Sequence, residues 1–204
     1  MFPSVAARYA DPATEFVVIR LTDPQFTSLL PLAGNRSMTA RGLLYASDLS
    51  GSWQAFLMDM KTRQSKLLTD AEQLDPGSLA IHPTGRGFLQ FDGTRLIETP
   101  FAAGKVREIY RLPAGVEKLP GVYYNDDGQN AAFVVKKAGR YQLQVLHLQR
   151  GTPTTLIESP AEIRDPLPRP RHNSLVFSSD GAIWMIDTDG RVFAKCRDQV
   201  SLKA

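Results

Sequence analysis

The sequence has very little cysteine and lacks long apolar runs. Its single cysteine, Cys196, excludes a disulfide bond within the chain. No run of about 18 apolar residues occurs, so no transmembrane helix is expected. Residues 1–10 contain no apolar stretch long enough for a secretory signal. The compartment stays open: the missing signal favours the cytoplasm, whereas a processed N-terminus would allow a periplasmic or exported protein.

The common catalytic signatures are also missing. There is no Gly-x-Ser-x-Gly elbow, no phosphate-binding glycine-rich loop and no His-Glu-x-x-His motif. Only three histidines occur, and they fall at different positions of the repeat described below, so convergence on a metal is not expected. We interpret His82 as a turn residue, His147 as a satisfied, partly buried strand residue, and His172 as a solvated loop residue. No catalytic residue and no metal ligand is predicted.

Charge of one sign is not concentrated anywhere. The chain has 24 Lys and Arg against 21 Asp and Glu, which gives a net charge of +3. A nucleic-acid-binding protein would cluster its basic residues, whereas here most of them lie beside turns. We therefore expect neither a nucleic-acid nor a membrane partner.

Short apolar runs repeat along the chain. The runs are marked by Leu44, Phe88, Ala132 and Leu175, and the steps between these markers are 44, 44 and 43 residues. Each run is followed by a second apolar run, a turn and a third run. The second runs are 55–58, 95–98, 143–146 and 183–186, and the third runs are 66–68, 106–109, 155–157 and 192–194. Further strands precede two of the markers, at 79–81 and 122–124.

Four strands in a period of about 44 residues are typical of β-propeller blades, including WD40-like repeats. The sequence therefore predicts an all-β propeller of about four four-stranded blades over residues 15–204, after an N-terminal tail at 1–14. These blades form either a small ring of their own or part of a larger seven-bladed ring. The inner strand of the first blade is expected between residues 28 and 39. One short helical turn is expected at 69–73.

Residues 15–21 (Glu-Phe-Val-Val-Ile-Arg-Leu) read as an additional strand. In propellers an N-terminal strand commonly completes the last blade, so pairing with residues 192–195 would give a compact monomer. The alternatives are an ordinary edge strand and an open chain that self-associates through uncovered apolar blade faces.

The motif Leu43-Leu44-Tyr45-Ala46-Ser47-Asp48, followed by 51–54, 57–59 and 67–70, resembles the repeat of TolB-type propellers. The leading Arg20-Leu21-Thr22-Asp23 and the order of the blades resemble the oligogalacturonate lyase family, from about Asp11 to Arg191. This resemblance implies a seven-bladed propeller. It also implies β-elimination on pectic uronate oligosaccharides, assisted by manganese that histidines and a glutamine hold.

The chain departs from the lyase pattern. It has about four blades, its first loop (31–36) lacks histidine, and 177–181 reads Phe-Ser-Ser-Asp-Gly where the family would place a histidine. No catalytic residue is carried over. We predict a TolB-like binding or interaction module without a complete lyase site. The alternative is a lyase-like enzyme represented by an incomplete chain, and manganese would bind only if a complete site exists elsewhere. A scaffold for protein partners is a third hypothesis.

Three arginines lie among three prolines in the stretch 163–171, which leads into the fourth blade. Arginine suits bidentate contact with carboxylates, and proline lowers the entropy that a loop loses on binding. Arg164, Arg169, Arg171 and His172 are therefore the candidate ligand-binding residues, with uronate as the ligand. The alternative is a rigid connector between blades that carries solvated arginines.

Trp53 and Trp184 occupy corresponding positions in two of the repeats. We expect both to pack between blades, with sugar stacking as the alternative. Seven aspartates recur at strand ends, and we expect them to cap turns without calcium. They are Asp48, Asp59, Asp126, Asp127, Asp180, Asp187 and Asp189.

Overall fold

The computed structural model describes residues 1–40, 42–189 and 191–196, and these residues form an all-β protein. The elements are β1 (Ala7–Ala10), β2 (Val17–Arg20), β3 (Ser28–Leu29), β4 (Gly42–Ser47), β5 (Gln54–Asp59), β6 (Ser65–Leu67), the 3₁₀ helix η1 (Pro76–Ser78), β7 (Ala80–Ile81), β8 (Gly87–Asp92), β9 (Arg95–Pro100), β10 (Arg107–Arg111), β11 (Val116–Lys118), β12 (Tyr123–Tyr124), β13 (Asn130–Lys137), β14 (Arg140–His147), β15 (Thr152–Ser159), β16 (Ile163–Pro168), β17 (Ser174–Ser179), β18 (Ala182–Asp187) and β19 (Val192–Cys196). In the described ranges, no helix has the length and apolar character needed to cross a membrane.

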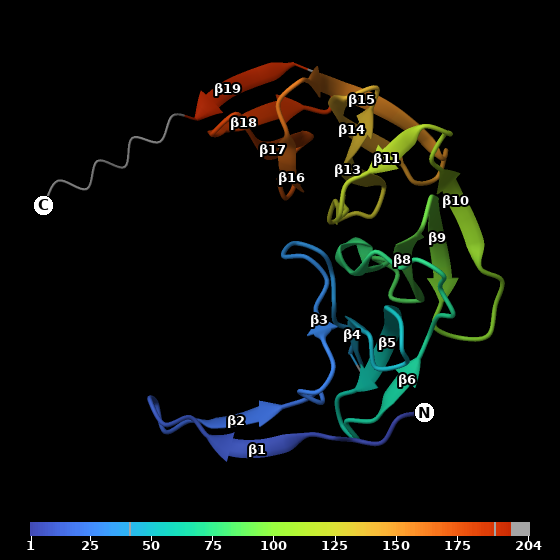
Figure 1. Ribbon diagram of the computed structural model, residues 1–204, viewed down its shortest axis with the longest axis vertical. Helices are drawn as coiled ribbons and strands as arrows, with labels where there is room; N and C mark the ends of the chain where they lie inside the picture. The colour runs from blue at the N-terminus through green and yellow to red at the C-terminus, as the bar shows by residue number, and fades with distance from the viewer. Residues whose placement is uncertain (41, 190, 197–204) are drawn as a thin grey trace, which may run out of the picture. The chain divides into compact units, whose positions relative to one another are not determined.

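The strands form four blades and a separate hairpin (Figure 1). The first blade has the order β3-β4-β5-β6, the second β7-β8-β9-β10 and the fourth β16-β17-β18-β19. In the third blade β13, β14 and β15 are joined by an inner edge that is split into β11 and β12, and both of these pair with β13. The predicted propeller of about four four-stranded blades is confirmed.

The chain divides into two compact units, residues 1–93 with 98–106, and residues 94–97 with 107–204. In the first unit, β4 alternates between two apolar layers because successive side chains of a strand point to opposite faces. Leu44 and Ala46 belong to the layer that also contains Leu79 and Phe88. Tyr45 points to the other face, where it stacks on Phe56 with the ring centroids 5.4 Å apart.

The second unit has its core between the third and fourth blades. It is built from buried side chains of β13 and β14, together with Ile163, Leu175, Phe177 and Ile186 of the fourth blade. Trp184 packs against this cluster, as Trp53 does against the cluster of the first unit. Each cluster joins two neighbouring blades, so the expectation that both tryptophans pack between blades is confirmed.

The helical turn expected at 69–73 is wrong, since the 3₁₀ turn lies at η1 instead. The buried amide of Gln54 holds residues 69–71 beside the start of β5. Its Oε1 accepts hydrogen bonds from Ala71 N and Thr69 Oγ1, both at 2.8 Å, and its Nε2 donates to Ala71 O at 2.9 Å. These bonds occupy the backbone groups of Ala71 that a helical turn would need.

The inner strand of the first blade is confirmed as β3, at the start of the expected span. Residues 17–20 form the expected strand β2, and the described hydrogen bonds of β2 run to β1, within residues 1–14. The hairpin turns at Asp11, whose carboxylate accepts a 2.6 Å bond from Thr14 Oγ1. Pairing of residues 15–21 with 192–195 stays a prediction.

Residues 163–168 are not a connector between blades, so that alternative is wrong. They form β16, the inner edge strand of the fourth blade. Its two prolines are tolerated because an edge strand has one row of N–H groups that need no partner strand.

Candidate functional site

The four predicted ligand-binding residues lie at both ends of β16. Arg164 is its second residue, whereas Arg169, Arg171 and His172 lie in the loop between β16 and β17. Four residues lie between Arg164 and Arg169, and five steps along a strand correspond to roughly 15 Å. The structure therefore brings three of the four residues together and leaves Arg164 apart.

The loop after β16 is a tight hairpin. Arg169 N donates to Ser174 O at 2.9 Å, and His172 N donates to Arg169 O at 3.2 Å. The half-buried Arg169 side chain lies 3.2 Å from Met185 Sδ and 3.4 Å from Ser174 Oγ. Arg171 and His172 are exposed, and Arg171 has φ = 61°. The expectation of an exposed loop at His172 is confirmed.

A β-bulge distorts β16 near its start. Arg164 pairs with Ser178 and Leu167 pairs with Val176, so Asp165 and Pro166 together oppose Phe177. Asp165 has φ = 50°, in the left-handed region that non-glycine residues seldom adopt. Because of the bulge, Ile163 and Pro166 are buried, whereas the two residues between them, Arg164 and Asp165, are exposed. Bulges of this kind redirect side chains and are frequent beside functional sites.

The bulge faces a depression of about 150 Å³, here called the Tyr123 cavity. Its polar lining comes from Tyr123 on β12 and from Glu162, Arg164 and Asp165 around the start of β16. Tyr123 Oη donates to Asp165 Oδ1 at 3.1 Å, and Arg164 Nη2 donates to Glu162 Oε2 at 2.5 Å. Burial, then the hydrogen bond to Asp165 and its negative charge, raise the pKa of Tyr123 to about 12.

A second depression of about 260 Å³, here called the Trp184 cavity, shares the lining residue Ile163 with the Tyr123 cavity. Its floor is apolar, and Ser159, Ser179 and Asp180 supply its polar groups. The half-buried Trp184 donates its indole N–H to Ser179 O at 3.1 Å, which fixes the orientation of the ring. This is the composition of a ligand pocket, namely an apolar surface with a few polar groups placed around it.

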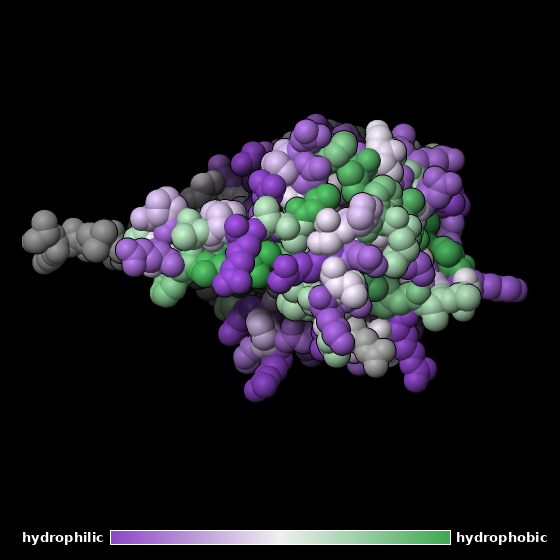
Figure 2. Space-filling model, turned by 90° about the horizontal axis from the view of Figure 1, so that it is seen from below, coloured by the Kyte–Doolittle hydropathy of each residue, from purple (hydrophilic) through white to green (hydrophobic). Residues whose placement is uncertain are grey.

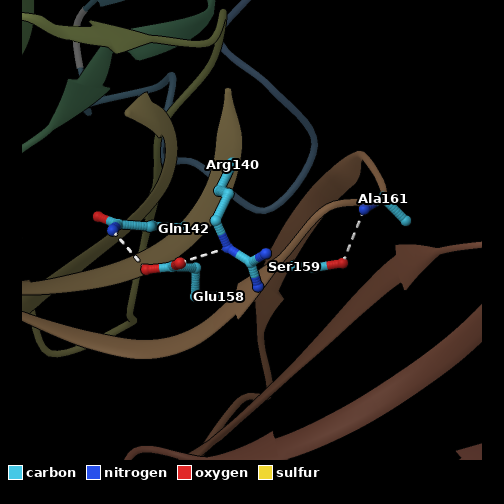
Figure 3. A network of polar contacts seen from close by, with 5 residues as sticks. All are labelled: Arg140, Gln142, Glu158, Ser159 and Ala161. Atoms are coloured by element: carbon cyan, nitrogen blue, oxygen red, sulfur yellow. Dashed lines mark hydrogen bonds and ion pairs between the residues drawn. The ribbon is translucent and has the colours of Figure 1, made fainter. Parts of the chain in front are cut away.

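A polar network borders the Trp184 cavity on the third blade (Figure 3). Glu158 accepts hydrogen bonds from Gln142 Nε2, at 2.9 Å, and from Arg140, and these bonds lower the pKa of Glu158. Ser159, the next residue, accepts a 3.0 Å bond from Ala161 N. The network holds the end of β15 and the connection to β16 in place beside the cavity.

The three histidines behave differently from one another. His82 is in a turn, as predicted, with its Nδ1 2.9 Å from Thr84 Oγ1. His147 is half-buried, as predicted. Its Nδ1 has no hydrogen-bond partner among the described residues, so the expectation that its ring is fully satisfied is wrong. Within the described ranges, no three side chains of His, Cys, Asp or Glu gather into a group that could hold a metal ion.

Turn capping is confirmed for two of the predicted aspartates, Asp59 and Asp127. Asp59 accepts backbone hydrogen bonds from residues 61 and 62, both at 2.8 Å, and these bonds lower the pKa of its carboxyl group. Asp127 likewise accepts a backbone bond from Gln129 N at 2.8 Å. The carboxylate of Asp48 instead accepts a 2.9 Å bond from Thr27 N, 21 residues earlier, and so joins the ends of β3 and β4.

Sequence reasoning missed Tyr123 and Asp165. The sequence places Tyr123 only within the strand expected at 122–124, and Asp165 only within the arginine- and proline-containing stretch 163–171. One usable signal was Pro166 inside a strand-like run, because proline within a strand indicates an edge strand or a bulge. The partnership between Tyr123 and Asp165 had no local signal, since 42 residues separate them.

The arrangement is suited to binding polar groups. With a pKa of about 12, Tyr123 keeps its proton at neutral pH and is a poor base. Arg164 and Asp165 are exposed and can exchange solvent for the oxygens of a ligand. The Trp184 cavity adds an apolar surface on which the carbon face of a ring can lie.

The sequence matches no family model and no curated protein sequence. Solved structures resemble it closely. One described as an oligogalacturonate lyase in complex with manganese has a TM-score of 0.87 at 20% identity, covering 95% of this chain and 60% of that one. An oligogalacturonate lyase from Vibrio parahaemolyticus has a TM-score of 0.85 at 17% identity, covering 94% of this chain and 59% of that one.

TolB from Acinetobacter baumannii has a TM-score of 0.62 at 19% identity, covering 93% of this chain and 50% of that one. The chain thus spans about 60% of the length of the lyases, and at these identities the likeness establishes the fold and not the activity. The chain has the β-propeller fold that oligogalacturonate lyases and TolB-like proteins share.

Proposed function

We propose that the chain is a TolB-like propeller module that binds a uronate oligosaccharide across the Tyr123 and Trp184 cavities. The supporting observation is the adjacency of the two cavities, which share Ile163. The apolar face of one sugar would lie on Trp184, and its hydroxyls would bond to Ser159 and Asp180. Arg164 would exchange Glu162 for a uronate carboxylate on the next sugar, as a guanidinium forms paired hydrogen bonds with carboxylates.

Isothermal titration with an oligogalacturonate and with a neutral oligosaccharide of equal length tests this proposal. We expect the acidic oligomer to bind and Arg164→Gln to weaken its binding about tenfold or more, since a hydrogen bond to a charged group contributes about 1.5–3 kcal/mol. Trp184→Ala should weaken both oligomers, and its melting temperature must be recorded because the side chain also packs on the core. Arg150→Gln, in an exposed turn of the same unit, is the matched control.

Three outcomes would overturn parts of the proposal. Absence of binding to either oligomer would reject carbohydrate recognition. Equal binding of both oligomers, unaffected by Arg164→Gln, would reject the uronate assignment. Loss of binding in Arg171→Ala with full binding in Arg164→Gln would move the ligand to the loop that contains Arg169, Arg171 and His172.

β-Elimination on uronate oligosaccharides is the second candidate function. It is favoured by the superposition with lyases, whose TM-scores of 0.87 and 0.85 exceed the 0.62 of TolB. The test is the ultraviolet absorbance of the unsaturated product, measured with and without added manganese. Turnover by this chain would reject a role limited to binding, whereas binding without turnover would support the module.

A further inference from the structure

One edge of β2 pairs with β1, and the backbone N–H and C=O groups on the other edge point away from β1. Asp11 N donates to Phe16 O at 2.8 Å, which sets the phase of the antiparallel ladder. Because backbone groups alternate along a strand, Val18 and Arg20 direct theirs toward β1, whereas Val17 and Ile19 direct theirs to the opposite edge. In the part of the chain that the structure describes, no hydrogen bond is found for the backbone of Val17 or Ile19 on this edge.

Exposed apolar side chains concentrate around this edge. Fourteen large apolar residues of the described chain are exposed, and nine of them lie within the first 30 residues. On the hairpin the exposed fractions are 74% for Phe16, 54% for Val17, 39% for Ile19 and 51% for Tyr9. Figure 2, which looks at the face with the hairpin, shows hydrophobic surface between hydrophilic groups. An open strand edge with apolar side chains is a site for pairing with another strand.

We propose that β2 pairs with β2 of a second copy of this chain, antiparallel about a two-fold axis at Val18. Val17 then lies opposite the partner's Ile19, and Phe16 lies opposite the partner's Arg20, each twice by symmetry. The apolar pair is of the kind that stabilises a sheet, and Phe16 with the partner's Arg20 forms a cation–π pair. The two hairpins become one four-stranded sheet.

The alternation of backbone groups limits the possible registers, and the pairing of apolar side chains selects among them. Only registers in which outward groups meet outward groups are allowed, so Val17 can face the partner's Val17 or Ile19 but not its Val18. Centring the axis on Val17 would place Glu15 opposite the partner's Ile19. Centring it on Ile19 would place Val18 opposite the partner's Arg20. Each of these alternatives forms one pair between exposed apolar residues of β2, Val17 with Val17 or Ile19 with Ile19. The register centred on Val18 forms two such pairs, Val17 with Ile19 in both directions.

The groove beside the hairpin extends this apolar contact. It has a volume of about 260 Å³ and is lined mainly by apolar side chains of the first blade and its entry, with Ile19 at the hairpin. Val17 and Ile19 lie on the same face of β2, because alternate residues of a strand share a face. The partner's Val17 would therefore lie next to Ile19 at this groove and cover apolar surface that the first blade leaves exposed.

Analytical ultracentrifugation of the full chain over a range of concentrations tests the dimer, and amide hydrogen exchange locates it. We expect a concentration-dependent dimer in which the Val17 and Ile19 amides exchange more slowly as the dimer forms. V17K/I19K should raise the dissociation constant about tenfold or more, because like charges then face one another twice. V17E/I19K should bring it back to within about threefold of the wild type, because opposite charges then face one another. Val106→Lys alters another exposed apolar residue and should leave the dimer unchanged.

Circular dichroism melting shows whether each variant remains folded, and the comparison of the two double variants separates register from folding, since both carry two charged residues at the same positions. A monomer whose Val17 and Ile19 amides exchange slowly would overturn the proposal in favour of pairing within the chain, as with residues 192–195. A monomer in which both exchange rapidly would overturn it too. A dimer with equal affinity in both double variants would assign the interface to another surface.

Discussion

Tyr123 Oη donates a 3.1 Å hydrogen bond to Asp165 Oδ1, and this contact ties the inner strand β12 of the third blade to the inner strand β16 of the fourth. Asp165 reaches the hydroxyl from a bulge with φ = 50°. A backbone conformation of this kind costs about 1–3 kcal/mol and persists where the surroundings hold it. The hydrogen bond, Pro166 and the ladder on either side together hold the bulge at the Tyr123 cavity.

Asp165→Asn should shift the alkaline titration of Tyr123 to lower pH. The folded-state pKa of Tyr123 is raised to about 12, above the usual value of 10.0, so its contribution to stability is complete below pH 10 and is lost as pH rises through 12. Removing the carboxylate charge lowers this pKa, while burial keeps it above the usual value. Tyrosinate absorbance and denaturant unfolding between pH 10 and 12 measure both effects. Tyr123→Phe is the control, and identical titration curves in Asp165→Asn and the wild type would contradict the prediction.

Ala138→Gly should stabilise the third blade. Ala138 and Gly139 form the two-residue turn between β13 and β14, with φ of 48° and 78°, which is the conformation of a type I′ turn. An alanine in the left-handed region costs about 1 kcal/mol that glycine does not. We expect a gain of about 0.5–1 kcal/mol in the free energy of unfolding.

The reciprocal change, Gly139→Ala, is the matched control in the same turn. A Cβ at this position would meet no atom within 4 Å, so the backbone conformation alone should cost about 1 kcal/mol. Urea unfolding measures both variants. Equal stabilities of the two would show that the turn does not hold these conformations.

Gln54→Ala should destabilise the first unit by about 2–4 kcal/mol. The substitution leaves the N–H and C=O of Ala71 without their side-chain partner in a buried environment, and each unsatisfied buried group costs about 1–3 kcal/mol. The melting temperature and urea midpoint test this. Gln64→Ala, at an exposed position, should change stability by less than about 0.5 kcal/mol. A loss in Gln54→Ala no larger than in this control would remove the explanation offered for residues 69–71.

Phe133→Ala should be among the most destabilising single substitutions in the second unit. Phe133 is completely buried in β13, with its ring centroid 6.2 Å from that of Tyr110. Truncation of a buried phenylalanine costs about 3–5 kcal/mol, because it loses apolar burial and leaves a cavity. Val106→Ala, at a 58% exposed position, is the control and should be nearly neutral. Calorimetry that showed similar losses for both variants would contradict the assignment of the core.

The arginines around β16 illustrate where sequence reasoning ends. Their types and their proximity in the sequence suggested one binding stretch from Arg164 to His172. A stretch that becomes a strand places its two ends far apart, and here the bulge at Asp165 also changes which side chains face outward. The candidate site consequently retains Arg164 and draws its other groups from Tyr123 and Trp184, which come from strands distant in the sequence.

The sequence by itself determined the four-blade repeat, since the spacing from Leu44 to Leu175, the alternation of apolar residues and the turns between them depend on neighbouring residues. It likewise indicated the strand at β2 and the turn at His82. Only the tertiary structure decided that β2 pairs with β1, that Gln54 binds the backbone of Ala71, and that Tyr123 meets Asp165. These contacts depend on how strands pair and how blades pack. They are stabilised by hydrogen bonds and apolar burial between groups that come together only in the folded chain.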